Sequence, residues 1–103
     1  MVRKRVVFRG HVQGVGLRGT LSKQCLRRHV TGWMSNAPDP SMVLAELQGD
    51  MRSIDTVLRS VASYFSDSTR SRGMSVSIIG EVDPIDADAE MHEVQWSDVG
   101  ETF

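Results

Sequence analysis

The sequence predicts an α+β sandwich in which two helices cover one face of a mainly antiparallel sheet. Two observations favour this class. Strand-like segments rich in β-branched residues alternate with segments of helical pattern, and the clearest helical pattern extends over residues 54–65. The chain has 103 residues, so we expect a single domain over residues 1–103.

The first half of the pattern is a strand, a loop and a helix. Residues 5–12 are rich in β-branched and aromatic side chains and predict the first strand. Gly14 and Gly16 end this strand and permit a tight loop. Residues 17–29 then follow a helical pattern. Its predicted apolar side comprises Leu21, Cys25 and Leu26.

Two strands and the clearest helix come next. Residues 30–35 and 42–48 predict strands, joined by a turn at residues 36–41 that contains two prolines. Apolar residues alternate with other residues in 42–48, which predicts that one face of this strand is buried. The second helix has one apolar side at the spacing i, i+3, i+4, i+7, i+8 and i+11. This side comprises Ile54, Val57, Leu58, Val61, Ala62 and Phe65.

Two strands complete the pattern. We expect them at residues 74–82, after a polar loop at 66–73, and at residues 91–96, where Val94 and Trp96 form the apolar set. The order β-α-β-β-α-β, followed by a short strand, is the ferredoxin-like arrangement. It places the glycine loop at the start of the first helix, at one edge of the sandwich.

The charged residues are unevenly distributed along the chain. The net charge is −1, but residues 1–30 carry +8 and residues 31–103 carry −9. A basic N-terminal third fits an anionic ligand, either a small phosphate compound or a nucleic acid. Alternatively, these bases form a solvated face whose partner is the acidic part of the chain. The sequence leaves both interpretations open.

Several function classes are not expected. Cys25 is the only cysteine, so no internal disulfide forms, and we expect a buried, inert thiol. His11, His29 and His92 lie far apart without metal-ligand spacing, so no metal site is expected. No run approaches the ~18 apolar residues that a membrane helix needs. No small-residue cleavage site follows the basic N-terminus, so we expect a cytoplasmic protein without a membrane partner.

The glycine-rich segment at residues 10–18 joins the first strand to the first helix. The first N–H groups of a helix lack partners within it, and the helix dipole adds positive charge there. Together with the planar donors of Arg18, such a loop suits a phosphate group. The alternative is a turn that binds nothing. Residues 14–19 also match GxGxxG, but the acidic residue that dinucleotide sites place about 20 positions on is missing.

Two motifs resemble those of a known family. The run Gly-x-Val-Gln-Gly-Val-x-x-Arg at residues 10–18 is similar to the signature loop of acylphosphatases. The run Gly-Trp-Met-Ser-Asn at residues 32–36 resembles the family's second motif, which ends in an essential asparagine. The resemblance covers residues 5–96 and implies a ferredoxin-like fold and hydrolysis of acyl phosphates without metal or cofactor. It implies that Arg18 and Asn36 are catalytic. The phosphate-binding residues that it implies are Gln13, Gly14, Val15, Gly16, Leu17 and Arg18.

The sequence departs from the family's pattern at three places. Leu17 stands where the family usually has phenylalanine, which changes the packing under the loop. The turn after Asn36 contains Asp39 and Pro40 instead of Asp-Gly and is one residue longer, which can move Asn36 relative to Arg18. A Gly-Pro pair before the fourth strand is missing. The alternative function is therefore a weak or inactive acylphosphatase-like domain that binds anions or RNA.

The expected partner is a small acyl phosphate, and we expect a monomer. RNA-binding sheets of this arrangement carry aromatic residues on the third strand, whereas residues 43–47 read Val-Leu-Ala-Glu-Leu. Nucleic-acid binding is therefore not expected.

Overall fold

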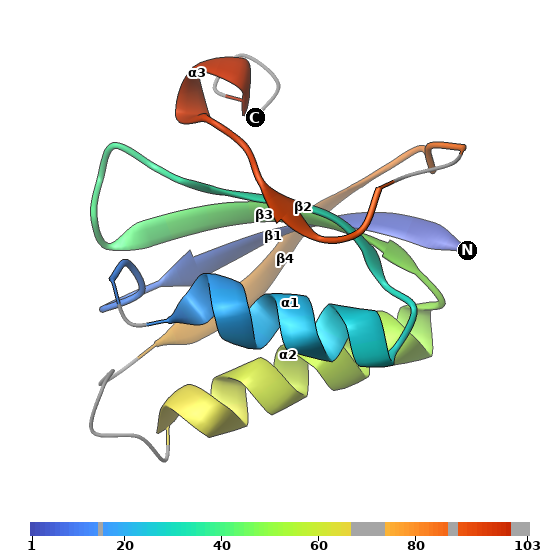
Figure 1. Ribbon diagram of the computed structural model, residues 1–103, viewed down its shortest axis with the longest axis horizontal. Coiled ribbons are helices and arrows are strands. Elements are labelled where there is room, and N and C mark those ends of the chain that lie inside the picture. The colour runs from blue at the N-terminus through green and yellow to red at the C-terminus, as the bar shows by residue number, and fades with distance from the viewer. Residues whose placement is uncertain (15, 67–73, 87–88, 100–103) are drawn as a thin grey trace.

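The computed structural model describes residues 1–14, 16–66, 74–86 and 89–99. Its elements are β1 (Val2–Arg9), α1 (Leu17–Arg27), β2 (Thr31–Asn36), β3 (Met42–Gly49), α2 (Met51–Ser66), β4 (Ser75–Val82), β5 (His92–Glu93) and α3 (Trp96–Val99). The five strands form one sheet in the order β4-β1-β3-β2-β5. All pairs are antiparallel except β2 with β5. The helices α1 and α2 lie side by side against one face, and α3 lies on the other (Figure 1). The predicted ferredoxin-like arrangement is confirmed.

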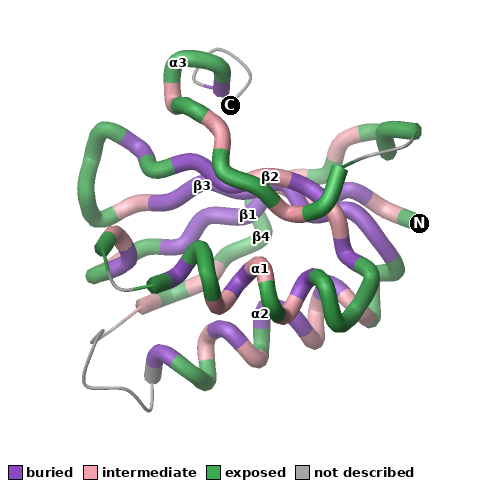
Figure 2. The backbone as a smooth tube through the Cα atoms, viewed as in Figure 1, coloured by how far each residue is buried: buried purple, intermediate pink, exposed green. Residues whose placement is uncertain are grey.

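The core fills the layer between the sheet and the two long helices, where the buried segments in Figure 2 face each other. Five of the six residues predicted for the apolar side of α2 are buried, and Ala62 is half-buried. On α1 the buried residues are Leu17, Leu21 and Cys25, which recur every fourth position. Leu26 is 63% exposed, so its predicted place on the apolar side was wrong. It follows Cys25 by about 100° around the helix and therefore points away from that stripe.

The first strand lies three residues earlier than predicted. β1 pairs with β3 from Val2 opposite Gly49 to Arg9 opposite Met42. The chain leaves the sheet at Gly10, which has a φ of 120° and donates its N–H to the Ser41 carbonyl oxygen at 2.9 Å. The first helix ends at Arg27, two residues early, and His29 adopts a left-handed φ of 56°. Residues 67–73, most of the predicted polar loop, lie outside the described residues.

The last predicted strand, residues 91–96, was wrong at its C-terminal end. Only His92 and Glu93 form a strand, and Trp96 begins the short helix α3 instead. The Val94 N–H still donates to the Met34 carbonyl oxygen at 2.9 Å, after which the chain leaves the sheet edge. Val99 of α3 is buried, so this segment covers part of the sheet face that α1 and α2 leave open.

The strand β3 is buried on both faces, although alternation predicted one buried face. Its polar residues Glu46 and Gln48 are buried, and both have polar partners. Glu46 accepts from the Arg3 Nε at 2.6 Å and from the Arg5 Nε at 3.1 Å. The Gln48 amide exchanges two hydrogen bonds of 2.7 Å with the backbone of Ile85. Buried polar groups with such partners avoid most of the cost of leaving water.

The basic N-terminal segment therefore pairs with acids from the rest of the chain. Arg3 and Arg5 pair with Glu46, and Lys4 pairs with Glu81 on β4. For these three bases the acidic partner expected by the second interpretation is confirmed, but the expected solvated face is wrong for Arg3, which is buried against Glu46. None of the helices in the described part of the chain has the length and apolar composition of a membrane-spanning segment.

Candidate functional site

The N-terminus of α1 is open to solvent and carries no side-chain cap among the described residues. The residue before the helix is Gly16 with a φ of 86°, and Gly14 has a φ of 74°. Both values are left-handed, a conformation that glycine adopts without the steric cost of a Cβ atom. None of the first-turn residues of α1 is acidic. The unpaired N–H groups and the helix dipole therefore present partial positive charge at this end.

A hollow of about 410 Å³ opens in front of this helix end. The glycine loop, the first turn of α1, the C-terminal end of β2 and β5 form its walls. Its apolar walls are Val12, Leu17 and Met34, and its polar side chains are Arg18, Asn36 and Glu93. Arg18 and Asn36, which are well apart in the sequence, thus line the same hollow.

Four of the six predicted phosphate-binding residues line this hollow: Gly14, Gly16, Leu17 and Arg18. Leu17 is 2% exposed and packs into the core beneath the loop. Gln13 is not among the lining residues, and Val15 lies outside the described residues.

The Gln13 side chain instead ties the glycine loop to the turn that follows Asn36. Its Nε2 donates to the carbonyl oxygens of Ala37, Asp39 and Met42 at 2.9, 3.2 and 3.1 Å. A side-chain amide that contacts three carbonyl groups holds the two segments in one relative position. The motif suggested that Gln13 belongs to the site, but nothing in the sequence indicated that its amide faces the turn.

The turn after Asn36 is closed by its own hydrogen bonds. The Ala37 N–H donates to the Met42 carbonyl oxygen at 3.1 Å. The Asp39 Oδ1 accepts from the Ser41 N–H at 2.9 Å and from the Ser41 Oγ at 2.7 Å. The hydrogen bond from the Ser41 backbone, followed by the one from its hydroxyl, lowers the pKa of Asp39 below its ordinary value. The longer turn therefore has a defined shape, and Asn36 still lines the hollow with Arg18.

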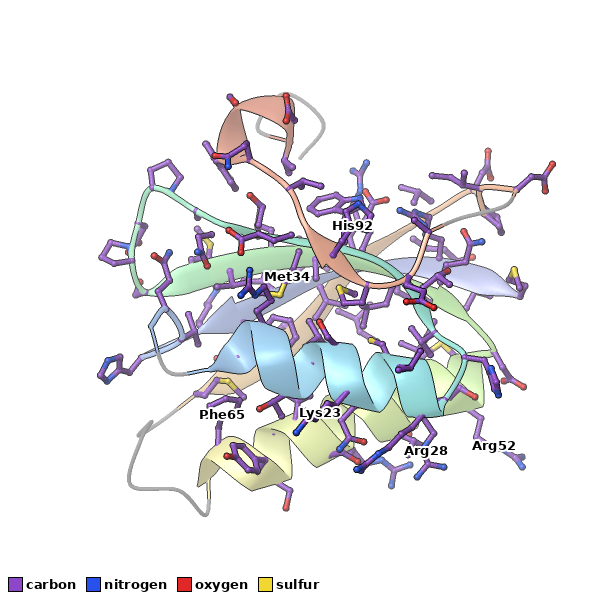
Figure 3. The ribbon with its side chains drawn as sticks, viewed as in Figure 1. Lys23, Arg28, Met34, Arg52, Phe65 and His92 are labelled. Carbon is purple, nitrogen blue, oxygen red and sulfur yellow. The ribbon has the colours of Figure 1, made fainter. Side chains whose placement is uncertain are left out.

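Arg18 forms an ion pair across the mouth of the hollow. Its Nη1 lies 3.2 Å from the Glu93 Oε1, and the two side chains are 66% and 36% exposed. Glu93 reaches this place because β5 pairs in parallel with β2, with Glu93 beside Met34. Met34 points toward α1, whereas His92, which pairs with Trp33, points to the other side of the sheet (Figure 3). Sequence reasoning missed Glu93, because a strand of two residues gives no usable periodicity.

Neither a reactive thiol nor a metal-binding cluster is found among the described residues. Cys25 is fully buried, and burial raises the pKa of its thiol to about 12, which confirms the expectation of an unreactive cysteine. Within the described ranges, no three histidine, cysteine or acidic side chains gather closely enough to hold a metal ion.

The family model for acylphosphatase matches residues 4–93 of the chain. The acylphosphatase of Oceanobacillus iheyensis is 32% identical over 77 residues, which cover 75% of this chain and 84% of that protein. The one from Aeropyrum pernix is 34% identical over 58 residues, 56% of this chain and 57% of that protein. The acylphosphatase of Alcanivorax borkumensis is 38% identical over 61 residues, which cover 59% of this chain and 65% of that protein. The chain thus spans less than two thirds of the length of the last two relatives.

Solved structures share the fold. The crystal structure of acylphosphatase from Bacillus subtilis superposes with a TM-score of 0.70 at 24% identity, over 91% of this chain and 99% of that one. The structure of HypF from T. kodakarensis superposes with a TM-score of 0.71 at 18% identity, over 91% of this chain but 12% of that one. The same fold therefore occurs as a small part of a larger protein.

Proposed function

This chain belongs to the acylphosphatase family, and on that basis we propose that it hydrolyses acyl phosphates to a carboxylate and inorganic phosphate. The observation that carries the proposal is the hollow at the N-terminus of α1. There an uncapped helix end, the Arg18 guanidinium and the Asn36 amide line one space. In this arrangement the helix end and Arg18 can bind a phosphoryl group while Asn36 holds an attacking water beside it.

The phosphoryl group is bound by backbone and guanidinium donors. The backbone N–H groups of Gly14, Gly16, Leu17 and Arg18, which line the hollow, would surround its oxygens. The Arg18 side chain would add a pair of parallel donors. In a phosphoryl transfer the negative charge is spread over the three equatorial oxygens. Donors that are already oriented toward these oxygens stabilise the transition state without reorganisation.

Asn36 holds the attacking water. Its side-chain amide is too weak a base to remove a proton, so its contribution is to position the water in line with the bond that breaks. The water oxygen attacks phosphorus, and the bond between phosphorus and the carboxylate oxygen breaks. The protons of the water remain with the phosphate product. Gln13 supports this geometry, since it ties the glycine loop to the turn after Asn36.

The leaving group explains why so few groups suffice. The conjugate acid of a carboxylate has a pKa of about 4, so the carboxylate departs without a proton donor. The loose transition state makes little demand on the nucleophile. The proposal therefore uses no general acid, covalent nucleophile or metal ion, and Glu93 acts only through its contact with Arg18.

The side chains on the open face of the sheet do not favour the alternative function of an RNA-binding module. The polar groups of the two central strands on the face opposite α1 and α2 are occupied by the buried contacts of Glu46 with Arg3 and Arg5. Sheet-based RNA recognition uses exposed aromatic side chains at such positions.

The proposal is tested with benzoyl phosphate in the presence of EDTA. We expect turnover by the unmodified protein. Arg18→Ala is expected to lower kcat by at least about a hundredfold and to weaken inhibition by inorganic phosphate. Asn36→Ala is expected to abolish turnover while phosphate still inhibits or binds. Arg27→Ala, at the other end of α1, removes the same charge and serves as the control.

Normal turnover by a folded Arg18→Ala variant would contradict the assigned roles. If the unmodified protein does not hydrolyse benzoyl phosphate, salt-dependent binding to an RNA homopolymer distinguishes a nucleic-acid-binding module from an inactive anion-binding domain.

A further inference from the structure

A second hollow of about 410 Å³ lies beside the candidate phosphate site, between the C-terminal half of α1 and the segment that leads into β5. Its apolar walls include Cys25, Leu26, Val30 and Met91. Cys25 and Val30 are buried, and Met91 packs against the core. The exposed side chains of Lys23, His29 and Glu90 also line this hollow, whereas the buried Cys25 thiol is neutral over the physiological range.

The two hollows lie along the same two segments, α1 and the stretch around β5, although no residue lines both of them. On α1, Arg18 lines the first hollow and Ser22 the second, and residues four apart lie on the same helix face about 6 Å apart along the axis. On the segment opposite, Glu93 lines the first hollow and Met91 the second. Met91 lies in the bend directly before β5, and Glu93 is the last residue of that strand. The helix α1 lies beside β5 (Figure 1), and residues of both segments line the first hollow.

Leu26 is an exposed apolar part of the wall of the second hollow. It is 63% exposed, although leucine is among the side chains most often buried. It lies eight residues after Arg18, or about 12 Å along the helix axis. An apolar group that extends from the phosphate site along α1 would cover this side chain and remove its surface from water.

We infer that the second hollow binds the apolar part of the acyl group, so the substrates are acyl phosphates that carry an alkyl or aryl chain. The inference rests on the proposed function, since it requires the phosphoryl group at Arg18. It adds what the phosphate site alone does not specify, namely which acyl groups the protein selects. Each methylene group that enters the hollow raises kcat/KM by up to about fourfold, the factor that corresponds to burial of one methylene.

The inference is tested with acetyl, butyryl and hexanoyl phosphate. For the unmodified protein, kcat/KM is expected to rise from the first to the third. Leu26→Glu introduces a carboxylate at the wall of the second hollow and leaves the phosphate site intact. We expect this variant to hydrolyse acetyl phosphate within about twofold of the unmodified rate and to lose at least about fivefold on hexanoyl phosphate. Unchanged turnover of acetyl phosphate also shows that the variant is folded.

Gln24→Glu is the matched control. It makes the same change in charge on the same helix, at a residue that does not line the second hollow. This variant is expected to keep the preference for hexanoyl phosphate. The inference is overturned if acetyl phosphate is hydrolysed but kcat/KM does not rise with chain length. It is also overturned if Leu26→Glu and Gln24→Glu show the same ratio of kcat/KM for hexanoyl phosphate to kcat/KM for acetyl phosphate. By contrast, an absence of hydrolysis for all three compounds contradicts the proposed function and the inference together.

Discussion

Glu93→Gln is expected to tighten the binding of inorganic phosphate. In the structure the Glu93 carboxylate pairs with Arg18, the side chain that the proposed mechanism assigns to the phosphoryl group. A bound phosphate and this carboxylate therefore compete for the same guanidinium donors. Glutamine has nearly the same shape but no charge, so the substitution removes the competition and leaves the packing of β5 in place.

The magnitude of this effect follows from the exposure of the pair. The two side chains are 66% and 36% exposed, and their charged atoms lie 3.2 Å apart. Exposed ion pairs of this kind contribute about 0.2–1 kcal/mol. A phosphate that no longer has to break the pair should bind about 1.4-fold to fivefold more tightly, since 1.4 kcal/mol corresponds to a factor of ten. Loss of the negative charge beside a phosphate anion acts in the same direction.

Titration calorimetry with inorganic phosphate measures this affinity independently of catalysis. The gain should be largest at low ionic strength and shrink in 1 M salt, where charges are screened beyond about 3 Å. Glu90→Gln is the control, because it removes an equal charge three residues earlier, at a position that lines the second hollow but not the phosphate site. Unchanged phosphate binding by a folded Glu93→Gln variant would refute the competition. Weaker binding would refute it as well and would show that Glu93 holds Arg18 in its binding position.

Two predictions concern stability. Gly32→Ala should destabilise the protein severely in urea unfolding, because an added Cβ would lie 1.8 Å from the Glu46 carbonyl oxygen at a φ of 140°. Gly19 lies in α1 with open space around its Cα, so Gly19→Ala should instead raise the free energy of unfolding by about 0.5–1 kcal/mol. A similar loss of stability in both variants would contradict this reasoning. Burial raises the pKa of the Cys25 thiol from 9.0 to about 12. The free energy of unfolding, measured relative to Cys25→Ala, should therefore fall as the pH rises from 9 to 12, because the unfolded chain loses this proton first. If the free energies of unfolding of the two proteins change in parallel with pH, this prediction is wrong.

The order of the elements could be predicted because it depends on local patterns. Among residues 51–65 of α2, whose burial the structure describes, every buried position belongs to the stripe that its spacing predicted. An amphipathic helix shows its buried side in its own sequence. The ends of elements were less predictable. β1 begins at Val2 because Arg3 is buried against Glu46, a contact between residues far apart in the sequence. Trp96 begins α3 because the chain leaves the sheet edge after Val94.

By itself, the sequence determined the glycine loop, the helix that follows it and the two motifs that contain Arg18 and Asn36. Tertiary structure alone decided what surrounds them: the brace from Gln13 to the turn, and the carboxylate of Glu93 opposite Arg18. The physical reason is that side-chain periodicity specifies which side of a strand or helix faces the core. It does not specify the register of distant strands such as β2 and β5, which depends on packing across the whole sheet.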